Sequence, residues 1–181
     1  MTSPILVTGG TGALGRHVVR RLHDAGYDVR VLTRHSDAAK DGIEFMTGDL
    51  TTGQGIAPAV DGVETIVHLA GSAKGDEDKT RNLVRAASSQ TRLPHLVYIS
   101  VVGAERIPID SLVDRAMFGY FGSKRAAEKV VEDSGLPWTK MRATQFHDLI
   151  LMVTKQMAKL PVIPLPAGFR FQPVDAGDVA P

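Results

Sequence analysis

Hydrophobic positions along this chain fall into two alternating kinds of segment. Short apolar runs rich in β-branched residues predict buried strands, and these runs cover residues 5–7, 27–33, 43–46, 63–69, 95–100 and 137–142. Apolar residues at helical spacing predict helices over residues 13–25, 76–91, 116–134 and 146–160. The alternation of strand and helix predicts an α/β fold, namely a doubly wound parallel sheet with helices on both faces.

Glycines crowd the turn between the first predicted strand and the first predicted helix. Gly9, Gly12 and Gly15 follow a GxxGxxG spacing within the run Thr8–Gly15. Missing side chains permit a tight turn, let backbone amides approach a ligand, and let the helix lie close to the strand. The free N–H groups and the helix dipole would then face a phosphate group. We therefore predict a dinucleotide site, against the alternative of a glycine-rich turn without a ligand, and the residues expected to form it are Gly9, Thr11, Gly12, Ala13, Leu14 and Gly15.

The end of the second predicted strand bears on the choice of nucleotide. In a dinucleotide fold this end lies beside the adenosine ribose, where an acidic residue suits NAD and an arginine suits the 2′-phosphate of NADP. Arg34 follows the strand, and Arg16 lies just after the glycine turn as a second phosphate ligand. Asp37 could instead meet a ribose hydroxyl, and both arginines could be surface residues. The pattern favours NADP(H) over NAD(H).

Length and charge narrow the function further. The 181 residues are about the length of one domain, so we expect a single dinucleotide-binding domain over residues 1–181. The net charge of +1 favours a small-molecule substrate and gives no reason to expect nucleic acid as the partner. No apolar run approaches the ~20 residues that span a bilayer, and no leader segment precedes the first strand, so we expect no membrane association and a cytoplasmic protein.

Tyr120 and Lys124 lie on a predicted helix and form a pair that could take part in acid–base chemistry. At i and i+4 their side chains share one face, and a nearby cation favours the phenolate, which would lower the pKa of the tyrosine. Such a tyrosine can exchange a proton with an alkoxide while hydride is transferred. The alternative is an ordinary exposed helix face.

These motifs together make the chain resemble the extended or atypical short-chain dehydrogenase/reductase superfamily, a group of Rossmann-fold proteins. The stretches that carry the resemblance are Thr8–Gly15, Gly48-Asp49-Leu50, His68-Leu69-Ala70-Gly71, the YxxxK of Tyr120–Lys124, and Arg142–Phe146. Within that branch, Tyr98–Gly103 and Leu136–His147 look closest to NmrA-like NAD(P)-binding proteins, which include both reductases and non-catalytic redox sensors.

The resemblance implies roles for several further residues. Asp49 and Leu50 would meet adenine, and Leu69, Ala70 and Gly71 would line the cofactor. Ala143 and Thr144 would lie beneath the nicotinamide, and Lys124 would hold the nicotinamide ribose. Ser100 is the candidate for the third catalytic residue beside Tyr120 and Lys124, although in extended members this residue often lies slightly further along, where this chain has Val101 and Val102.

The last part of the chain is expected to contribute an incomplete substrate lid over residues 146–181. Phe146, Leu149, Met152 and Phe169 are candidates for an apolar substrate pocket, with ordinary core packing as the alternative. Compared with extended members, we expect the C-terminal substrate lobe to be truncated. Apolar side chains left uncovered in this way would favour a homodimer.

The combined prediction is an NADPH-dependent oxidoreductase that transfers hydride to a small apolar quinone or carbonyl acceptor. A non-catalytic NADP(H)-sensing regulatory protein is the alternative, and a cofactor-retaining epimerase or dehydratase shares the same motifs. His68 is interpreted as a packing residue at a strand end. The absence of cysteine and of any HExxH spacing predicts no metal site.

Overall fold

The computed structural model of the chain describes residues 3–35, 42–72, 75–106, 112–159 and 172–180. Within these ranges, the description at 112–118, 149, 152, 153 and 156 is limited to the backbone. The sheet and the turns at its carboxyl edge, which position the candidate site, therefore lie almost wholly within the described residues.

A single parallel sheet forms the centre of the molecule. Its strands are β1 (Ile5–Thr8), β2 (Val29–Thr33), β3 (Glu44–Thr47), β4 (Thr65–His68), β5 (His95–Val101) and β6 (Trp138–Ala143). The six strands lie in the order β3-β2-β1-β4-β5-β6, and each neighbouring pair is parallel. The strand order reverses between β1 and β4, and in sheets of this kind the crevice at that point binds the ligand.

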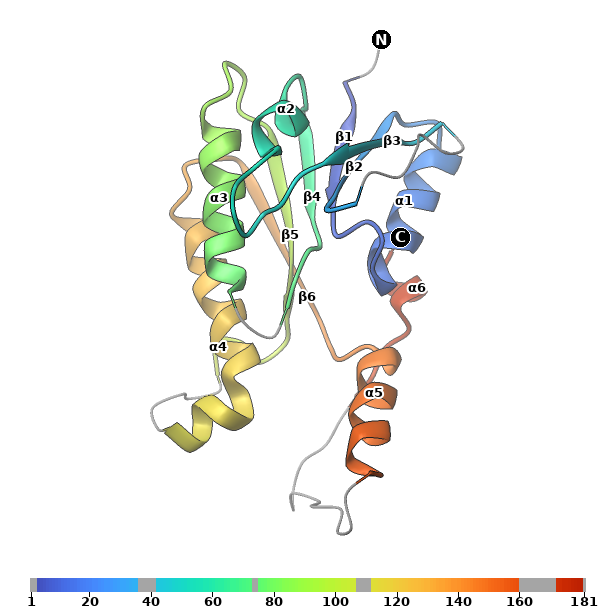
Figure 1. The fold of residues 1–181 in the computed structure, drawn as a ribbon, viewed down its shortest axis with the longest axis vertical. Helices are drawn as coiled ribbons and strands as arrows, with labels where there is room; N and C mark the ends of the chain where they lie inside the picture. The colour runs from blue at the N-terminus through green and yellow to red at the C-terminus, as the bar shows by residue number, and fades with distance from the viewer. Residues whose placement is uncertain (1–2, 36–41, 73–74, 107–111, 160–171, 181) are drawn as a thin grey trace.

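Helices cover both faces of the sheet. They are α1 (Ala13–Asp24), α2 (Ile56–Val60), α3 (Asp76–Ser88), α4 (Leu112–Glu132), α5 (His147–Met157) and α6 (Ala176–Val179). Figure 1 shows α3 and α4 side by side on one side of the sheet, while α1 and α6 lie on the other. The predicted doubly wound α/β fold is confirmed.

Side-chain alternation along the strands builds a separate core on each face. Leu6 of β1 and Ile66 of β4 pack into the larger core beneath α2, α3 and α4, together with Leu83 and Val131. Val7, next to Leu6, points the other way and packs with Val19, Val29 and Val31 beneath α1. Both faces of the central strands are buried, which explains why their sequences are nearly continuous apolar runs.

Both α2 and α4 differ from the sequence-based expectation, and α6 lies outside the four helices predicted from periodicity. α2 was not predicted, because its five residues include Pro58 and carry too short a pattern to show helical periodicity. α4 begins at Leu112, four residues before the predicted start at Ala116. The other predicted elements are confirmed with boundaries shifted by a few residues.

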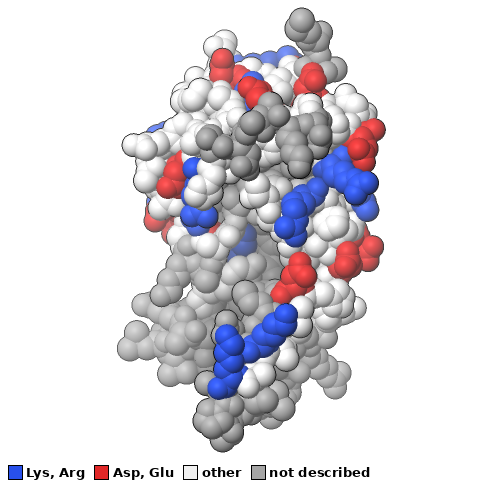
Figure 2. Space-filling view, turned by 45° about the vertical axis from the view of Figure 1, so that its right-hand side comes forward, with Lys and Arg blue, Asp and Glu red and all other residues white. Residues whose placement is uncertain are grey.

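The C-terminal segment returns to the first helix. An isolated parallel bridge joins Phe146 to Val174, and α6 then packs against α1. The side chain of Asp175 accepts a hydrogen bond from Gly177 N at 2.7 Å, which starts α6. On the face in Figure 2, acidic and basic side chains are interspersed among uncharged ones. None of the described helices is long and apolar enough to cross a membrane.

Candidate functional site

The glycine turn after β1 is held in a shape that side chains would prevent. Gly9 has a φ of +73°, and a Cβ on it would lie 2.6 Å from the Ala70 backbone nitrogen. A Cβ on Gly15 would lie 2.0 Å from the Gly9 carbonyl oxygen. The Gly12 amide donates to that same carbonyl at 3.0 Å and closes the turn. The glycines therefore bring β1, the loop after β4 and α1 into contact. The tight turn and the close approach of α1 to β1 were predicted, whereas the contact with the loop after β4 was not.

The first turn of α1 offers unpaired N–H groups. Its N-cap is Gly12, which has no side chain to cap the helix, and the first turn contains no acidic residue. The N-terminal amides of a helix have no partner within the helix, and they carry partial positive charge. This end of α1 consequently fits the pyrophosphate of a dinucleotide cofactor.

A groove of about 410 Å³ runs past this helix end, along the carboxyl ends of the strands. Its walls come from the glycine turn, the end of β2, the loop after β3, the loop after β4 and one residue of α3. The residues that line it are Gly9, Thr11, Gly12, Leu32, Thr33, Arg34, His35, Gly48, Asp49, Leu50, Thr51, Leu69, Ala70, Gly71, Ser72 and Lys79. The structure thus brings together the predicted phosphate, ribose, adenine and groove-wall residues from four separate stretches of sequence.

Other predicted cofactor residues lie outside this lining. Leu14 and Gly15 are buried and serve to pack α1 against the sheet, and Ala143 is buried at the end of β6. Ala13, Arg16, Lys124 and Thr144 are also absent from the groove wall, and Arg16 is exposed. Asp37, the alternative ribose ligand, lies outside the described residues.

Sequence reasoning missed several lining residues. Leu32, Thr33, His35 and Thr51 line the groove within two residues of predicted site residues, so the strand ends that marked Arg34 and Leu50 also pointed to them. Ser72 follows the predicted Leu69–Gly71 loop directly. Lys79 had no local signal, because a lysine in the first half of a helix is ordinarily a solvated surface residue.

Lys124 lies just behind the groove wall. Its ammonium pairs with a carboxylate oxygen of Asp76 at 3.1 Å, and the side chain is 5% exposed. It also lies 3.5 Å from the Tyr98 hydroxyl and 3.4 Å from the Ile99 carbonyl. A Cβ on Gly71, which lines the groove, would be 2.8 Å from the Lys124 Nζ. The ammonium therefore lies directly against Gly71, at a point of the groove wall where a side chain would collide with it.

The predicted effect of Lys124 on Tyr120 is wrong. Burial, followed by the negative charge of Asp76, raises the pKa of Tyr120 above its usual value of 10.0. The prediction of a lowered pKa assumed that the ammonium would act on the phenol four residues earlier, but in the structure that ammonium is paired with Asp76. A tyrosine with a raised pKa stays protonated at neutral pH and is a poor base.

Ser100 faces a charged cluster between β6 and α4. It is 4% exposed and lies beside the Glu128 carboxylate. The Arg142 guanidinium binds both oxygens of that carboxylate at 2.9 and 2.7 Å, and Lys140 lies 3.3 Å away. Ser100 does not line the groove, so its predicted role in orienting a carbonyl has no support from its surroundings.

His68 is buried in a chain of hydrogen bonds, in agreement with its interpretation as a packing residue. Burial, together with the charges of Lys124 and Lys79, lowers its pKa to about 3, so it is neutral. Thr80 donates to the Asp76 carbonyl at 2.7 Å, and its oxygen can then accept from His68 Nε2 at 3.1 Å. The other ring nitrogen accepts from the Thr8 hydroxyl at 2.6 Å.

The predicted substrate-pocket residues are described only in part. Phe146 pairs with Val174 through the bridge at the start of α5 and does not line the groove. Leu149 and Met152 lie on α5, but their side chains are outside the described part of the structure, as is the whole of Phe169. Across the described residues, no three His, Asp or Glu side chains come together in a way that could hold a metal ion.

A parallel sheet in this strand order, with an uncapped glycine turn at the point of reversal, defines a dinucleotide-binding Rossmann domain. Residues 9–152 match the family of NAD(P)H-binding proteins. The chain belongs to this family.

Curated relatives include several reductases. The chain is 32% identical over 145 residues to (4-alkanoyl-5-oxo-2,5-dihydrofuran-3-yl)methyl phosphate reductase from Streptomyces griseus, covering 78% of this chain and 48% of the relative. It is 35% identical over 138 residues to ceramide reductase from Caulobacter vibrioides, covering 70% and 41%. An NAD(P)H azoreductase from Xenophilus azovorans is 27% identical, with 97% and 60% covered. The chain therefore spans about half the length of the curated relatives that it matches.

Solved structures agree with the fold. A nucleoside-diphosphate-sugar epimerase from Staphylococcus aureus superposes with a TM-score of 0.75 at 20% identity, over 98% of this chain and 63% of that one. An NADPH-dependent quinone oxidoreductase from Escherichia coli, solved with NADPH, gives a TM-score of 0.69 at 23% identity, over 84% and 53%. These likenesses establish the Rossmann architecture and leave the reaction to be argued from the site.

Proposed function

We propose that this protein is an NADPH-dependent reductase that delivers hydride to a small apolar quinone or carbonyl acceptor. The observation that carries the proposal is the groove at the carboxyl edge of the sheet, which joins the uncapped end of α1 at Gly12 to the exposed Arg34. Such a groove suits a dinucleotide with an additional phosphate on its adenosine ribose.

The relatives support a reductase over other uses of the fold. Three of them are named as reductases, and the family as a whole is described as NAD(P)H-binding. Epimerases share the architecture at lower identity. Because the chain spans only part of each relative, the reaction and the acceptor remain our proposal for this protein.

Each end of the cofactor would have its own set of residues. The turn at Gly9–Gly12 would hold the pyrophosphate, Arg34 the 2′-phosphate, and Asp49 with Leu50 the adenine. Lys124, behind Gly71, would meet the hydroxyls of the nicotinamide ribose. A bound nicotinamide supplies the hydride, and the protein's part is to orient it and to provide a proton.

Tyr120 is the proposed proton donor. The phenol is protonated at neutral pH, and burial with the charge of Asp76 raises its pKa further above 10.0. A protonated phenol can give its proton to the oxygen that becomes an alkoxide as hydride arrives, whereas it accepts a proton poorly.

Replacing Arg34 tests the nucleotide preference. Arg34→Ser is expected to weaken NADPH binding about tenfold to hundredfold, the strength of hydrogen bonds to a charged phosphate, and to leave NADH binding unchanged. Titration calorimetry with both nucleotides measures this. Arg92→Ser, which removes another largely exposed arginine paired with Glu64, is the control and should alter neither affinity. Equal losses for both nucleotides would contradict the assignment of Arg34 to the 2′-phosphate.

Replacing Tyr120 separates the reductase from a second candidate. The second candidate is a non-catalytic NADP(H) sensor, and one feature of the site supports it. Lys124 is paired with Asp76, and Ser100 faces Glu128. Neither residue is therefore held beside Tyr120 by a described contact. For a reductase, Tyr120→Phe should reduce kcat with a panel of quinones and aldehydes about hundredfold or more while NADPH affinity stays the same. Phe121→Leu, at the neighbouring ring, is the control. Tight NADPH binding without turnover in the unmodified protein would favour the sensor.

A further inference from the structure

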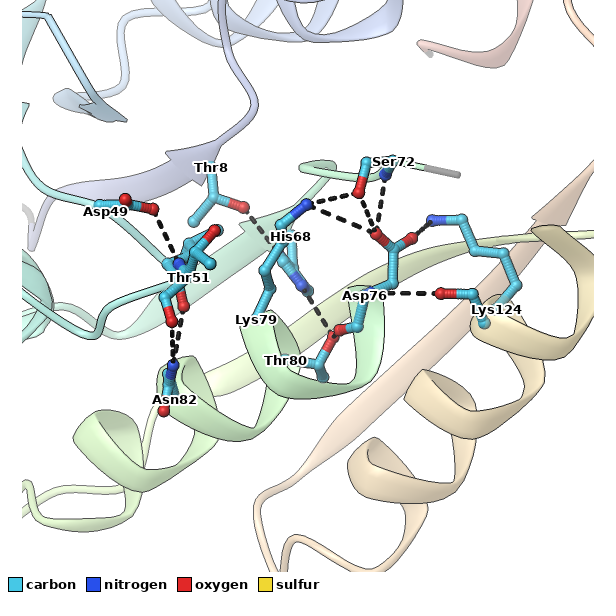
Figure 3. A network of polar contacts seen from close by, with 12 residues as sticks. Thr8, Asp49, Thr51, His68, Ser72, Asp76, Lys79, Thr80, Asn82 and Lys124 are labelled. Atoms are coloured by element: carbon cyan, nitrogen blue, oxygen red, sulfur yellow. Dashed lines mark hydrogen bonds and ion pairs between the residues drawn. The ribbon is translucent and has the colours of Figure 1, made fainter. Parts of the chain in front are cut away.

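Asp76 is the most highly connected charged residue near the groove, and no motif pointed to it. Its carboxylate is 1% exposed. One oxygen accepts from the Ser72 amide at 2.7 Å and the Ser72 hydroxyl at 3.3 Å, and the other faces the Lys124 ammonium at 3.1 Å. Figure 3 shows Ser72, Lys79 and Lys124 converging on this one carboxylate.

The backbone of Asp76 is tied down as well. Its amide donates to the Ser123 hydroxyl of α4 at 3.2 Å, and its carbonyl accepts from Thr80 at 2.7 Å. Gly75, with a φ of +77°, turns the chain into α3 just before it. An acidic side chain in the first turn of a helix is also stabilised by the helix dipole. The carboxylate is thus held at a defined point between the loop after β4 and α4.

Lys124 depends on this carboxylate. Among the residues that the structure describes, Asp76 is the only acidic group paired with its ammonium. The other contacts, to the Tyr98 hydroxyl and the Ile99 carbonyl, are neutral and at 3.4 Å or longer. A buried ammonium without a counter-ion is strongly disfavoured, so removing the charge of Asp76 would release the ammonium from its place behind Gly71.

We propose that Asp76 is a positioning residue that holds the Lys124 ammonium against the groove wall at Gly71, where it meets the nicotinamide ribose of the cofactor. The inference rests on the proposed function, because it takes the groove to be the NADPH site. Asp76 acts through Lys124 and through the Ser72 end of the groove wall. It couples the loop that lines the nicotinamide half of the groove to the helix that carries Tyr120.

The test compares two ligands on one variant. Asp76→Asn keeps the shape and an oxygen for Ser72 but removes the charge that holds Lys124. NADPH carries the nicotinamide ribose, whereas adenosine 2′,5′-bisphosphate carries only the adenosine end and its phosphates. We expect the Kd for NADPH to rise at least about tenfold and the Kd for the bisphosphate to change less than twofold.

The matched control is Asp78→Asn, in the same turn of α3. Its side chain is 71% exposed and pairs with Arg81, so neither Kd should change. Introducing Asp76→Asn into a Lys124→Met background should add no further loss of NADPH affinity, because both changes remove the same interaction. If Asp76→Asn does not fold, Asp76→Glu keeps the charge one methylene further out and should weaken NADPH binding alone.

Three outcomes would overturn the inference. Equal losses for both ligands would mean that Asp76 only supports the fold, and unchanged NADPH binding would mean that Lys124 does not need it. An additional loss in the Lys124→Met background would mean that Asp76 acts by another route. Failure of the NADPH-site assignment, on which the inference rests, has a different signature, since the unmodified protein would then bind neither ligand.

Discussion

Gly15→Ala is expected to destabilise the folded protein by about 3 kcal/mol and to abolish NADPH binding. The added Cβ would lie 2.0 Å from the Gly9 carbonyl oxygen and 2.6 Å from the Gly10 Cα. Both are backbone atoms of the turn, so the clash can be relieved only by moving α1 or opening the turn. For a chain of this size the loss corresponds to roughly 10 °C in Tm, measurable by circular dichroism.

Gly119→Ala is the matched control for that result. Gly119 lies in α4, its φ is outside the positive region, and a Cβ there would meet nothing within 4 Å. Alanine is favoured over glycine inside a helix, so this variant should be more stable by about 0.5–1 kcal/mol. If Gly15→Ala kept both its Tm and its NADPH affinity, the close packing of α1 on the turn would be contradicted.

Glu128→Gln is expected to cost about 3 kcal/mol at pH 7, because it leaves two cations beside a buried neutral amide. The Glu128 side chain is 5% exposed, and Arg142 and Lys140 both pair with it. Urea unfolding at pH 7 measures the loss. Glu132→Gln, one turn along α4, removes a 41% exposed carboxylate that pairs with the same lysine and should cost less than about 0.5 kcal/mol. Similar losses of unfolding free energy for the two variants would contradict the claim that burial makes the Glu128 ion pairs stronger than those of Glu132.

The stability difference between the unmodified protein and Glu128→Gln is expected to depend on pH. Burial by itself would raise the pKa of Glu128, but hydrogen bonds from Arg142 and the charge of Lys140 lower it from 4.5 to about 2. A lowered pKa in the folded state stabilises the protein above the unfolded pKa, and this stabilisation is lost as the pH falls. The stability difference between the unmodified protein and Glu128→Gln should therefore be full above pH 4.5 and should shrink toward pH 2. A difference that stayed constant over this range would contradict the ionised role of Glu128.

Local patterns predicted most of the fold. The central strands are buried on both faces, so apolar runs such as Leu6-Val7 identified them directly, and the glycine spacing located the turn. Short α2 escaped detection because five residues containing a proline carry no readable period. The predicted boundaries of α4 differ from the observed ones because the apolar pattern of a helix does not end at the same residues as its backbone hydrogen bonds.

The site was predictable where its residues follow the strand ends and unpredictable where it depends on long-range pairs. Arg34 and Asp49 line the groove because each follows a parallel strand. The pairing of Asp76 with Lys124 joins residues far apart in sequence, and an aspartate at a helix start ordinarily indicates a solvated first turn. The pKa of Tyr120 was therefore predicted in the wrong direction, since the counter-ion that occupies Lys124 could not be identified from spacing.

The central claim is that the amides at the start of α1 bind the pyrophosphate of a nicotinamide dinucleotide. The most direct test is an amide ¹H–¹⁵N correlation spectrum of the labelled protein during titration with NADP⁺. The account predicts that the largest shift changes fall on the amides in the first turn of α1, those of Ala13 and Leu14, with smaller changes at Arg34 and Gly71. Binding that left these amides unmoved, or no binding at all, would contradict it.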